Sequence, residues 1–489
     1  MIRYSGVLHN DMTISQTHTV FEHRVEKNGI VSVDLGLFFL ALFVFLCLFN
    51  PIAFQSLKLA VGILAILFSL PSLRFRREPL VVILLFCLMT VPALFISMMD
   101  GISFSTASFL LSFVYPFFYL ALFSRLSSAQ DLGKIAWAVL LAALSISVYD
   151  LLFCGASILK LELLLDFLQQ FELNAGFGFA GLMTEYTTSH MVSLLFTFPF
   201  LAIYAFCDNG KSSYSFLPRG LVVSVFVLQC ICVLLSGRKA IWIAAALCLV
   251  LALVIRRKHY GGDLYRKDEP TIVRLSAIVL SSLVLVFIIA QPSFWAYVGD
   301  LFASLSDAFS FGDPTKGSAY VRGQQSVALI NGWLESPLFG NGFGAYAADY
   351  IRDPDNFAAY ELTYLALLLQ KGLFGFALYF GICIWSLVRC YKIGCMKNEF
   401  SLFALSAAMG LLGMLIGDAT NPYMGRFACM WIFFLPSFVV SLQEETETTR
   451  KFGASHDSGK SLFQVSTRMQ KQASYNIITI PDMDAGKPN

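Results

Sequence analysis

The chain has 489 residues, of which 57% are apolar and only 13% are charged, and its mean hydropathy is +0.70. This is more apolar surface than the core of a soluble protein can bury, so the composition indicates a polytopic, all-α membrane protein and excludes a soluble enzyme. The net charge of +2 gives no reason to expect a nucleic-acid partner.

Residues 1–32 contain no apolar run directly after a basic start, so we expect no cleavable signal peptide and assign them to a cytoplasmic tail. About twelve apolar runs that can cross roughly 30 Å of hydrocarbon follow. They are 33–50, 52–70, 79–98, 103–124, 134–155, 185–206, 218–236, 239–255, 273–290, 361–388, 401–417 and 425–441. Residues 442–489 are polar and mixed in charge, which predicts a second flexible tail.

The connections between these spans alternate between rich and poor in basic residues. The rich set carries Arg74, Arg76, Arg77, Arg125, Lys134, Lys211, Arg219, Arg256, Arg257, Lys258, Arg266, Lys267, Arg389, Lys392 and Lys397. Cytoplasmic connections are enriched in Lys and Arg, so this set and both termini are predicted on the cytoplasmic side of the membrane. Spans 1–9 then cover 33–290, spans 10–12 cover 361–441, and one large outer loop covers 291–360.

The connection LLSGRKAIWIA falls on the outer side and still carries two cations, Arg238 and Lys239. One interpretation is that both side chains reach to lipid headgroups, as long cationic side chains near helix ends readily do. The other is a binding site for an anionic group at the outer membrane surface. The preceding Ser-Gly pair lets the backbone turn tightly and come close to such a ligand.

The long outer loop contains GSAYVRGQQSVALINGWLESPLFGNGFGAY. Its apolar spacing predicts a helix over Tyr320–Glu335 that carries Arg322 and ends before Pro337, followed by a glycine-rich turn. No strand precedes these glycines, so they do not form a dinucleotide-binding motif. Glu361 then stands at the outer mouth of the tenth span, as a functional carboxylate or as a first-turn residue favoured by the helix dipole.

Further polar residues are predicted on the same outer face. Glu185 and His190, in GLMTEYTTSHMVSLLF, lie at the predicted start of the sixth span. An acid at a helix end can equally face water, and a lone histidine can equally be packed between helices. The turn IGDATNPYMGRF adds Asp418, Asn421 and Arg426, which either line a sugar site or cap helices.

Three of these motifs in this order carry a resemblance: SGRK opening a helix, a later arginine-bearing helix ending in SPLFGNGFG, and YELTYLALLLQKGLFG. Over roughly residues 180 to 425 the chain resembles the O-antigen ligase and polymerase family of bacterial membrane proteins. The resemblance implies a helical, GT-C-like fold in the bacterial inner membrane, with 291–360 as one large periplasmic loop. It also implies transfer of a glycan from undecaprenyl pyrophosphate to a sugar hydroxyl, without metal, nucleotide or other cofactor. Arg238 matches the first family arginine and Arg322 the loop arginine.

The chemistry of these residue types agrees with that implication. Breaking a sugar–pyrophosphate bond develops negative charge on the leaving phosphate, and fixed cations can stabilise it. The planar guanidinium of Arg binds phosphate oxygens in pairs. The acceptor hydroxyl needs a base, for which Glu361 is the first candidate and Glu185 and His190 are weaker ones. Further candidates for contacts to pyrophosphate or glycan are Lys239, Asn421 and Arg426.

The sequence therefore predicts a polymerase of lipid-linked repeat units for O-antigen, capsule or exopolysaccharide. Ligases of the family typically carry a histidine where this chain has Tyr360 or Glu361, which favours the polymerase. The nearest alternative is a ligase that moves finished glycan onto the lipid core of lipopolysaccharide, and a remoter one is a flippase or exporter. A flippase should carry charge along a path through several helices. Expected partners are the lipid-linked donor, the glycan acceptor, membrane lipids, and a chain-length regulator or flippase.

Overall fold

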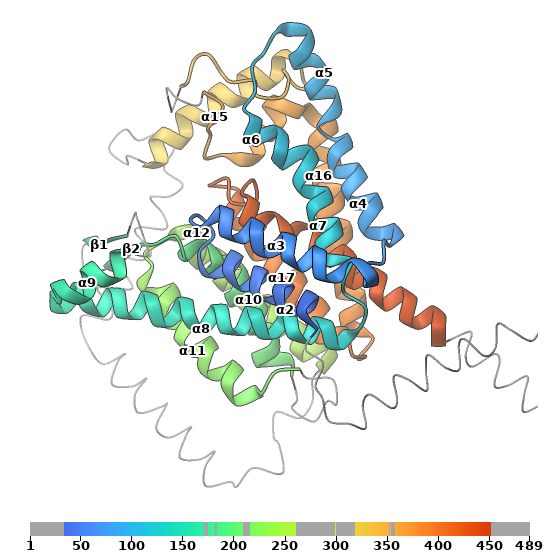
Figure 1. The fold of residues 1–489 in the computed structure, drawn as a ribbon. Helices are drawn as coiled ribbons and strands as arrows, with labels where there is room; N and C mark the ends of the chain where they lie inside the picture. Colours follow the sequence, from blue (N-terminus) through green and yellow to red (C-terminus); the bar gives the residue numbers. More distant parts are fainter. Residues whose placement is uncertain are drawn as a thin grey trace, which may run out of the picture.

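The structure is a computed structural model that describes residues 34–170, 175–180, 183–208, 216–260, 299, 318–351, 353 and 357–450. These residues are mostly helical, with one small hairpin (Figure 1). The helices of the first half are α2 (Leu35–Phe49), α3 (Gln55–Ser69), α4 (Arg77–Leu88), α5 (Val91–Asp100), α6 (Thr106–Phe109), α7 (Tyr115–Phe123), α8 (Ala129–Leu159) and α9 (Glu162–Gln169). Those of the second half are α10 (Met191–Cys207), α11 (Arg219–Leu235), α12 (Lys239–Ile255), α15 (Ser318–Glu335), α16 (Thr363–Cys395), α17 (Ser401–Asp418) and a last helix, Phe427–Arg450.

Eight stretches of helix in the described ranges are long and apolar enough to cross a membrane. They are Gln55–Ser72, Arg77–Asp100, Thr106–Phe123, Ala129–Leu159, Lys239–His259, Thr363–Cys395, Ser401–Asp418 and Phe427–Arg450. Helices α2, α10 and α11 are also apolar but shorter. The prediction of a helical protein with many membrane-length helices is therefore confirmed. The total of twelve spans stays a prediction, because the run 273–290 lies outside the described residues, as do the tail 1–32 and the first part of the predicted loop 291–360.

Helices α10 and α17 form the centre of the molecule and are buried along almost their whole length. Three glycines of α17, at positions 410, 413 and 417, face α10. A Cβ atom at Gly413 would lie 2.1 Å from the carbonyl oxygen of Leu195, so only glycine lets the two backbones approach this closely. Helices α8, α11 and α12 also pack against α10, and α16 packs against α17.

A β-hairpin stands where the sequence predicted the start of the sixth helix. Strand β1 (Gly176–Ala180) pairs antiparallel with β2 (Met183–Thr187), so the prediction of a helix starting at residue 185 is wrong. The helix begins only at Met191. The segment MTEYT is rich in β-branched and aromatic residues, and pairing with GFGFA satisfies its backbone without a helix. Glu185 therefore lies on a strand.

Helix α16 is broken at Gly372, whose φ of 62° and ψ of −169° are not helical. The loop after α15 fits into this break. Its backbone completes the interrupted helix by four hydrogen bonds: Asn341 N to Leu369 O at 2.8 Å, Gly342 N to Gln370 O at 3.2 Å, Leu373 N to Pro337 O at 2.9 Å and Phe374 N to Leu338 O at 2.9 Å. A Cβ atom at Gly372 would lie 2.4 Å from the nitrogen of Gly340, so only glycine lets the loop approach this closely. The SPLFGNGFG motif therefore supplies the hydrogen-bond partners that the broken membrane helix lacks.

Next to this break lies a buried cation, Lys371, which is 8% exposed. Its Nζ donates to Oγ1 of Thr90 at 2.7 Å, at the junction of α4 and α5, and lies 5.8 Å from the centre of the Phe343 ring. Phe343 in turn donates its backbone N–H to Ala93 O at 2.9 Å. The loop is therefore fixed between α16 and the α4–α5 junction.

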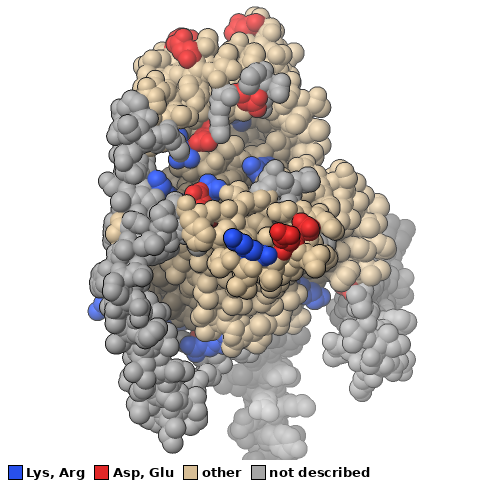
Figure 2. Space-filling view, turned by 90° about the vertical axis from the view of Figure 1, so that its left-hand side faces the viewer, with Lys and Arg blue, Asp and Glu red and all other residues tan. Residues whose placement is uncertain are grey.

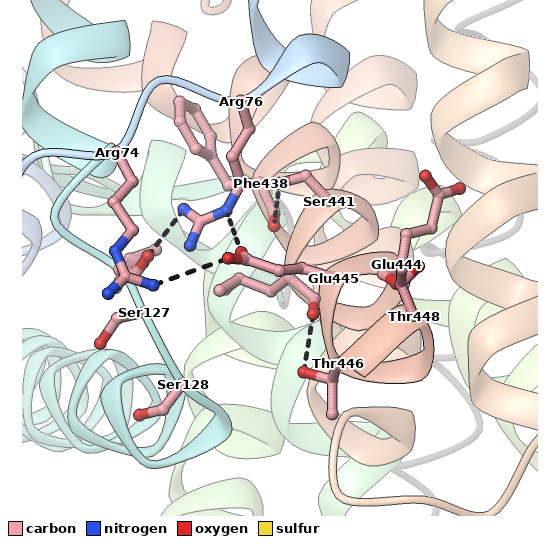
Figure 3. A network of polar contacts seen from close by, with 12 residues as sticks. Arg74, Arg76, Ser127, Ser128, Phe438, Ser441, Glu444, Glu445, Thr446 and Thr448 are labelled. Atoms are coloured by element: carbon pink, nitrogen blue, oxygen red, sulfur yellow. Dashed lines mark hydrogen bonds and ion pairs between the residues drawn. The ribbon is translucent and has the colours of Figure 1, made fainter. Parts of the chain in front are cut away.

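The opposite end of the bundle is held by ion pairs between basic connections and the last helix. Arg74 and Arg76 point toward Glu445 from the loop before α4 (Figure 3). Nε of Arg76 lies 2.9 Å from Glu445 Oε2, and its Nη1 donates to Leu126 O at 2.8 Å. Arg389 pairs with Glu444 in the same region. The last helix continues to Arg450, beyond the predicted limit of the last span at residue 441.

Candidate active site

Arg238 is presented by the tight turn between α11 and α12. Gly237 has a φ of +64°, a left-handed conformation that favours glycine, so α11 can end and α12 can begin within a few residues. The Arg238 backbone N–H donates to Ser236 Oγ at 3.3 Å, and its carbonyl accepts from Trp242 N at 3.1 Å as the first bond of α12. Lys239 follows as the first residue of α12 and is half-buried.

The side chain of Arg238 extends to strand β2. Its Nη1 lies 3.2 Å from Glu185 Oε1, and its Nη2 donates to the hydroxyl of Thr187. The side chains of Arg238 and Glu185 are 43% and 42% exposed. This ion pair is open to solvent, so an anionic ligand can reach the guanidinium by displacing Glu185.

Strand β2 is fixed from its other face. Side chains alternate across a strand, so Tyr186 points away from Glu185 and Thr187 and is fully buried. The Tyr186 hydroxyl donates to Asp150 Oδ2 at 3.0 Å, and the Thr188 hydroxyl donates to Asp150 Oδ1 at 3.1 Å. Burial and the nearby Asp150 raise the pKa of Tyr186 well above its usual value, so the phenol stays protonated and keeps donating.

A second arginine–carboxylate pair joins α15 to the start of α16. Nε of Arg322 lies 2.8 Å from Glu361 Oε2, and the two side chains are 23% and 19% exposed. One turn along α15, the buried Gln325 accepts the backbone N–H of Leu362 at 3.0 Å. Behind these polar contacts α15 packs on α16 through an apolar cluster of Ala328, Leu329, Ala347, Tyr360 and Leu369.

The turn between α17 and the last helix carries a tyrosine whose pKa depends on members of both arginine–carboxylate pairs. Its Tyr423 is half-buried, and burial raises the pKa of the hydroxyl. The charged groups near enough to change this pKa are, in decreasing order of effect, Arg426, Arg238, Arg322 and Glu361. The three cations lower the pKa and the carboxylate raises it. Charge effects weaken with distance, so these four side chains, from four separate segments, are near enough to Tyr423 to change its pKa.

The same turn is anchored to the helix before it. Asp418, fully buried at the end of α17, accepts the backbone N–H of Met424 at 2.8 Å. The guanidinium of Arg426 lies 5.6 Å from the centre of the Tyr423 ring, within the range of a cation–π contact. The side-chain amide of Asn421 donates to Thr420 Oγ1 at 3.4 Å, and its backbone carbonyl accepts the N–H of Tyr423 at 2.7 Å. Asn421 therefore shapes the turn.

Figure 2 shows the face that carries the hairpin and α15. Lys and Arg atoms gather there with Asp and Glu atoms in a recess between the upper part of the molecule, which includes α15, and the body beneath it (Figure 2). The two arginine–carboxylate pairs come from β2 with the α11–α12 turn, and from α15 with the residues just before α16. In the described part of the chain, no group of three His, Cys, Asp or Glu side chains is arranged to hold a metal ion.

His190 lies elsewhere, in the packing between helices. It is fully buried, its ring stacks on Phe49 with centroids 4.9 Å apart, and Tyr149 meets it edge-on at 4.4 Å. Its Nδ1 is bonded to the Phe49 carbonyl. The structure therefore places His190 among aromatic side chains, and neither of the two arginine–carboxylate pairs includes it.

Four residues of this arrangement were missed by the sequence reasoning: Asp150, Thr187, Gln325 and Tyr423. Asp150 alone carried a signal, since an acid inside an apolar run is costly in a membrane and therefore needs a partner or a function. Thr187, Gln325 and Tyr423 are ordinary residue types in their segments. Only the folded chain brings them to the arginines.

Residues 224–380 match the family described as O-antigen ligase. The matched range contains Arg238, Arg322, Glu361 and the loop that fits into α16. No curated protein matches the chain.

Proposed function

Proceeding from the O-antigen ligase domain at residues 224–380, which confirms the resemblance drawn from its motifs, we propose that the protein is a polymerase of surface-polysaccharide repeat units. A glycan on undecaprenyl pyrophosphate is the donor, and a sugar hydroxyl of another lipid-linked glycan is the acceptor. The family match supports a ligase- or polymerase-type glycosyltransferase acting on lipid-linked glycans. The polymerase and the undecaprenyl pyrophosphate carrier are our proposal.

One observation carries this proposal: arginines from three segments are near enough to one half-buried tyrosine to lower its pKa, and two of them are paired with carboxylates. The pyrophosphate would displace Glu185 from Arg238 and Glu361 from Arg322. Each guanidinium could then bind phosphate oxygens in pairs, with Arg426 and the Tyr423 hydroxyl adding further donors. The cations are already in place and need no reorganisation when the leaving phosphate becomes more negative.

The freed Glu361 carboxylate is the proposed base. It takes the proton of the acceptor hydroxyl while the hydroxyl oxygen bonds to the anomeric carbon of the donor. The bond from that carbon to the phosphate oxygen breaks, and its electron pair leaves with undecaprenyl pyrophosphate. The products are the lengthened glycan and the lipid pyrophosphate, and Glu361 passes its proton to solvent. In the resting protein the pairing of Glu361 with Arg322 keeps the carboxylate from acting without donor.

We place this site at the periplasmic face of the inner membrane, with residues 291–360 as the periplasmic loop and both termini in the cytoplasm. Supporting this orientation, the ion pairs of the basic connections Arg74, Arg76 and Arg389 all lie at the end where the last helix finishes. The two arginine–carboxylate pairs lie on outer connections of the same alternation. A chain-length regulator or flippase is a candidate partner there.

The test is reconstitution of the purified full chain with lipid-linked repeat units in the presence of a chelator. A ladder of lengthened glycans is the expected product. A parallel reaction also contains the lipid core of lipopolysaccharide as a possible acceptor. Transfer of glycan onto that core without a ladder would assign a ligase, and movement of the lipid-linked sugar across the bilayer without either product would assign a flippase. A strict need for added metal would contradict the arginine mechanism.

A further inference from the structure

Helix α9 has three distinct faces. It follows α8 after Lys160, which has a left-handed φ of +53° and turns the chain. Leu168 is 5% exposed and faces α8, where the Tyr149 hydroxyl donates to its carbonyl at 2.8 Å. Glu162 and Asp166, one turn apart, form an exposed polar face. Leu163, at 89% exposure, lies on the third face, between the other two.

An apolar face with this exposure needs an apolar partner. The exposed residues of the neighbouring helix α8 indicate that this partner is lipid. Four exposed residues of α8 lie within about 20° of one line along the helix at 100° per residue. They are Leu141, Val148, Leu152 and Leu159, which are 47%, 43%, 47% and 69% exposed. Because α8 is a membrane-length helix, this line is its lipid-facing side. The line runs to the last residue of α8, directly before α9.

The length of α8 indicates where α9 lies relative to the hydrocarbon of the bilayer. At about 1.5 Å per residue its 31 residues extend well beyond roughly 30 Å of hydrocarbon. Two charged residues, Lys160 and Glu162, follow at this end, so the last turns of α8 leave the hydrocarbon at the headgroup boundary. A helix with an apolar face, a polar face and low net hydrophobicity lies in the plane of that boundary. Exposed Phe179 of the hairpin, 65% exposed, lies just beyond α9 in sequence.

We propose that α9 is an interfacial helix that inserts Leu163 into the outer part of the acyl chains, while Glu162 and Asp166 face water. The partner of this surface is the lipid of the leaflet at the end of the bundle that carries the arginines. Lipid contact along α8 and α9 is then continuous.

This contact has a consequence for the site. Strand β1 begins at Gly176, shortly after α9 ends at Gln169, and strand β2 carries Glu185 and Thr187, which hold Arg238. An anchored α9 therefore fixes the height of Arg238 relative to the lipid phosphates. This second step rests on the proposed function, whereas the membrane contact does not.

The test uses the full chain in lipid nanodiscs, with tryptophan placed at either of two positions of α9. In Leu163→Trp the new emission should be quenched by lipids brominated near the headgroup, and less by lipids brominated near the chain end. In Asp166→Trp, the matched control on the polar face, brominated lipids should leave the new emission unchanged. The parental chain measures the background of the six native tryptophans.

Two results would overturn the membrane contact. Equal emission of the Leu163→Trp variant in brominated and plain lipid would show that this face is in water. Quenching in discs with one chain but not in discs with two would show that a second copy covers the face.

Activity tests the second step separately. Leu163→Asn should raise the KM for lipid-linked donor with little change in kcat, and Asp166→Asn should leave both unchanged. Parental KM in Leu163→Asn, together with lipid quenching at position 163, would refute the link to Arg238 while leaving the membrane contact intact. If no variant and no parental chain transfers glycan, the proposed function fails, and the fluorescence result still stands.

Discussion

Replacing Arg322 with lysine keeps the positive charge of α15 but removes the planar guanidinium. In the structure Nε of Arg322 donates to Glu361 at 2.8 Å, and once the pyrophosphate has displaced this carboxylate the planar guanidinium can present two nitrogens to its oxygens. Lysine has a single nitrogen and cannot bind a pair of phosphate oxygens in that geometry. Losing one such donor costs about 3 kcal/mol in the transition state, so we expect turnover to fall roughly a hundredfold.

Folding of the Arg322→Lys variant should stay near parental. Lysine keeps a positive charge beside Glu361, so the carboxylate of this partly exposed pair is not left without a cation. Arg450→Lys is the matched control, because Arg450 donates to Glu399 Oε1 at the same distance of 2.8 Å at the other end of the bundle. That variant should transfer glycan at the parental rate.

The assay measures initial rates of glycan lengthening by purified chain from lipid-linked repeat units, at saturating and at low donor. Thermal unfolding of each variant reports its folding. If Arg322→Lys is folded and its rate lies within about twofold of the parental rate, paired binding by the guanidinium is refuted. Arg322 then acts as a point charge or as an anchor in the headgroups.

Three further predictions concern the carboxylates and the break in α16. Glu361→Gln should fold and bind donor but fail to transfer glycan, while Glu361→Asp keeps part of the rate, because only an ionised carboxylate accepts the proton; near-parental rates for the glutamine variant would remove Glu361 from the mechanism. Glu185→Gln removes the anion that competes for Arg238, so the KM for donor should fall with kcat little changed, and a higher KM would mean that Glu185 itself holds substrate. Gly372→Ala should lower the free energy of unfolding by at least about 1–3 kcal/mol, because its φ of 62° suits only glycine and a Cβ would overlap Gly340. Gly381→Ala, in open space on the same helix, is its control in thermal unfolding, and equal midpoints would contradict this account.

The sequence predicted most helices because an apolar run of membrane length has few alternatives. It failed at the hairpin, where the β-strand 183–187 leads directly into α10 and hydropathy does not separate them. It also failed at α16, because the run is apolar on both sides of Gly372, and the break depends on a loop glycine, Gly340, that precedes the helix.

For the site, residue types and motif order singled out Arg238, Arg322 and Glu361. Their contacts were not predictable in the same way. The pairing of Arg238 with Glu185 depends on how Asp150 holds strand β2 against α8, and the approach of both arginines to Tyr423 depends on a turn more than a hundred residues later in the chain. Such contacts follow from the packing of separate helices, which periodicity within one segment does not determine.

The broken backbone of α16 also bears on how the chain is made. Its partners, the loop at 337–342 and the junction around Thr90, all precede Gly372 in the chain, so the ribosome has produced them before the break emerges. The carbonyls of Leu369 and Gln370, which the break leaves without a donor inside α16, can therefore find their donors in the loop as soon as they enter the bilayer, without waiting for α17. A fragment translated from residue 345 onward would insert the same apolar helix with these carbonyls unsatisfied, a state that costs several kcal/mol per group in hydrocarbon. We expect a quality-control protease to degrade that fragment while it spares the full chain.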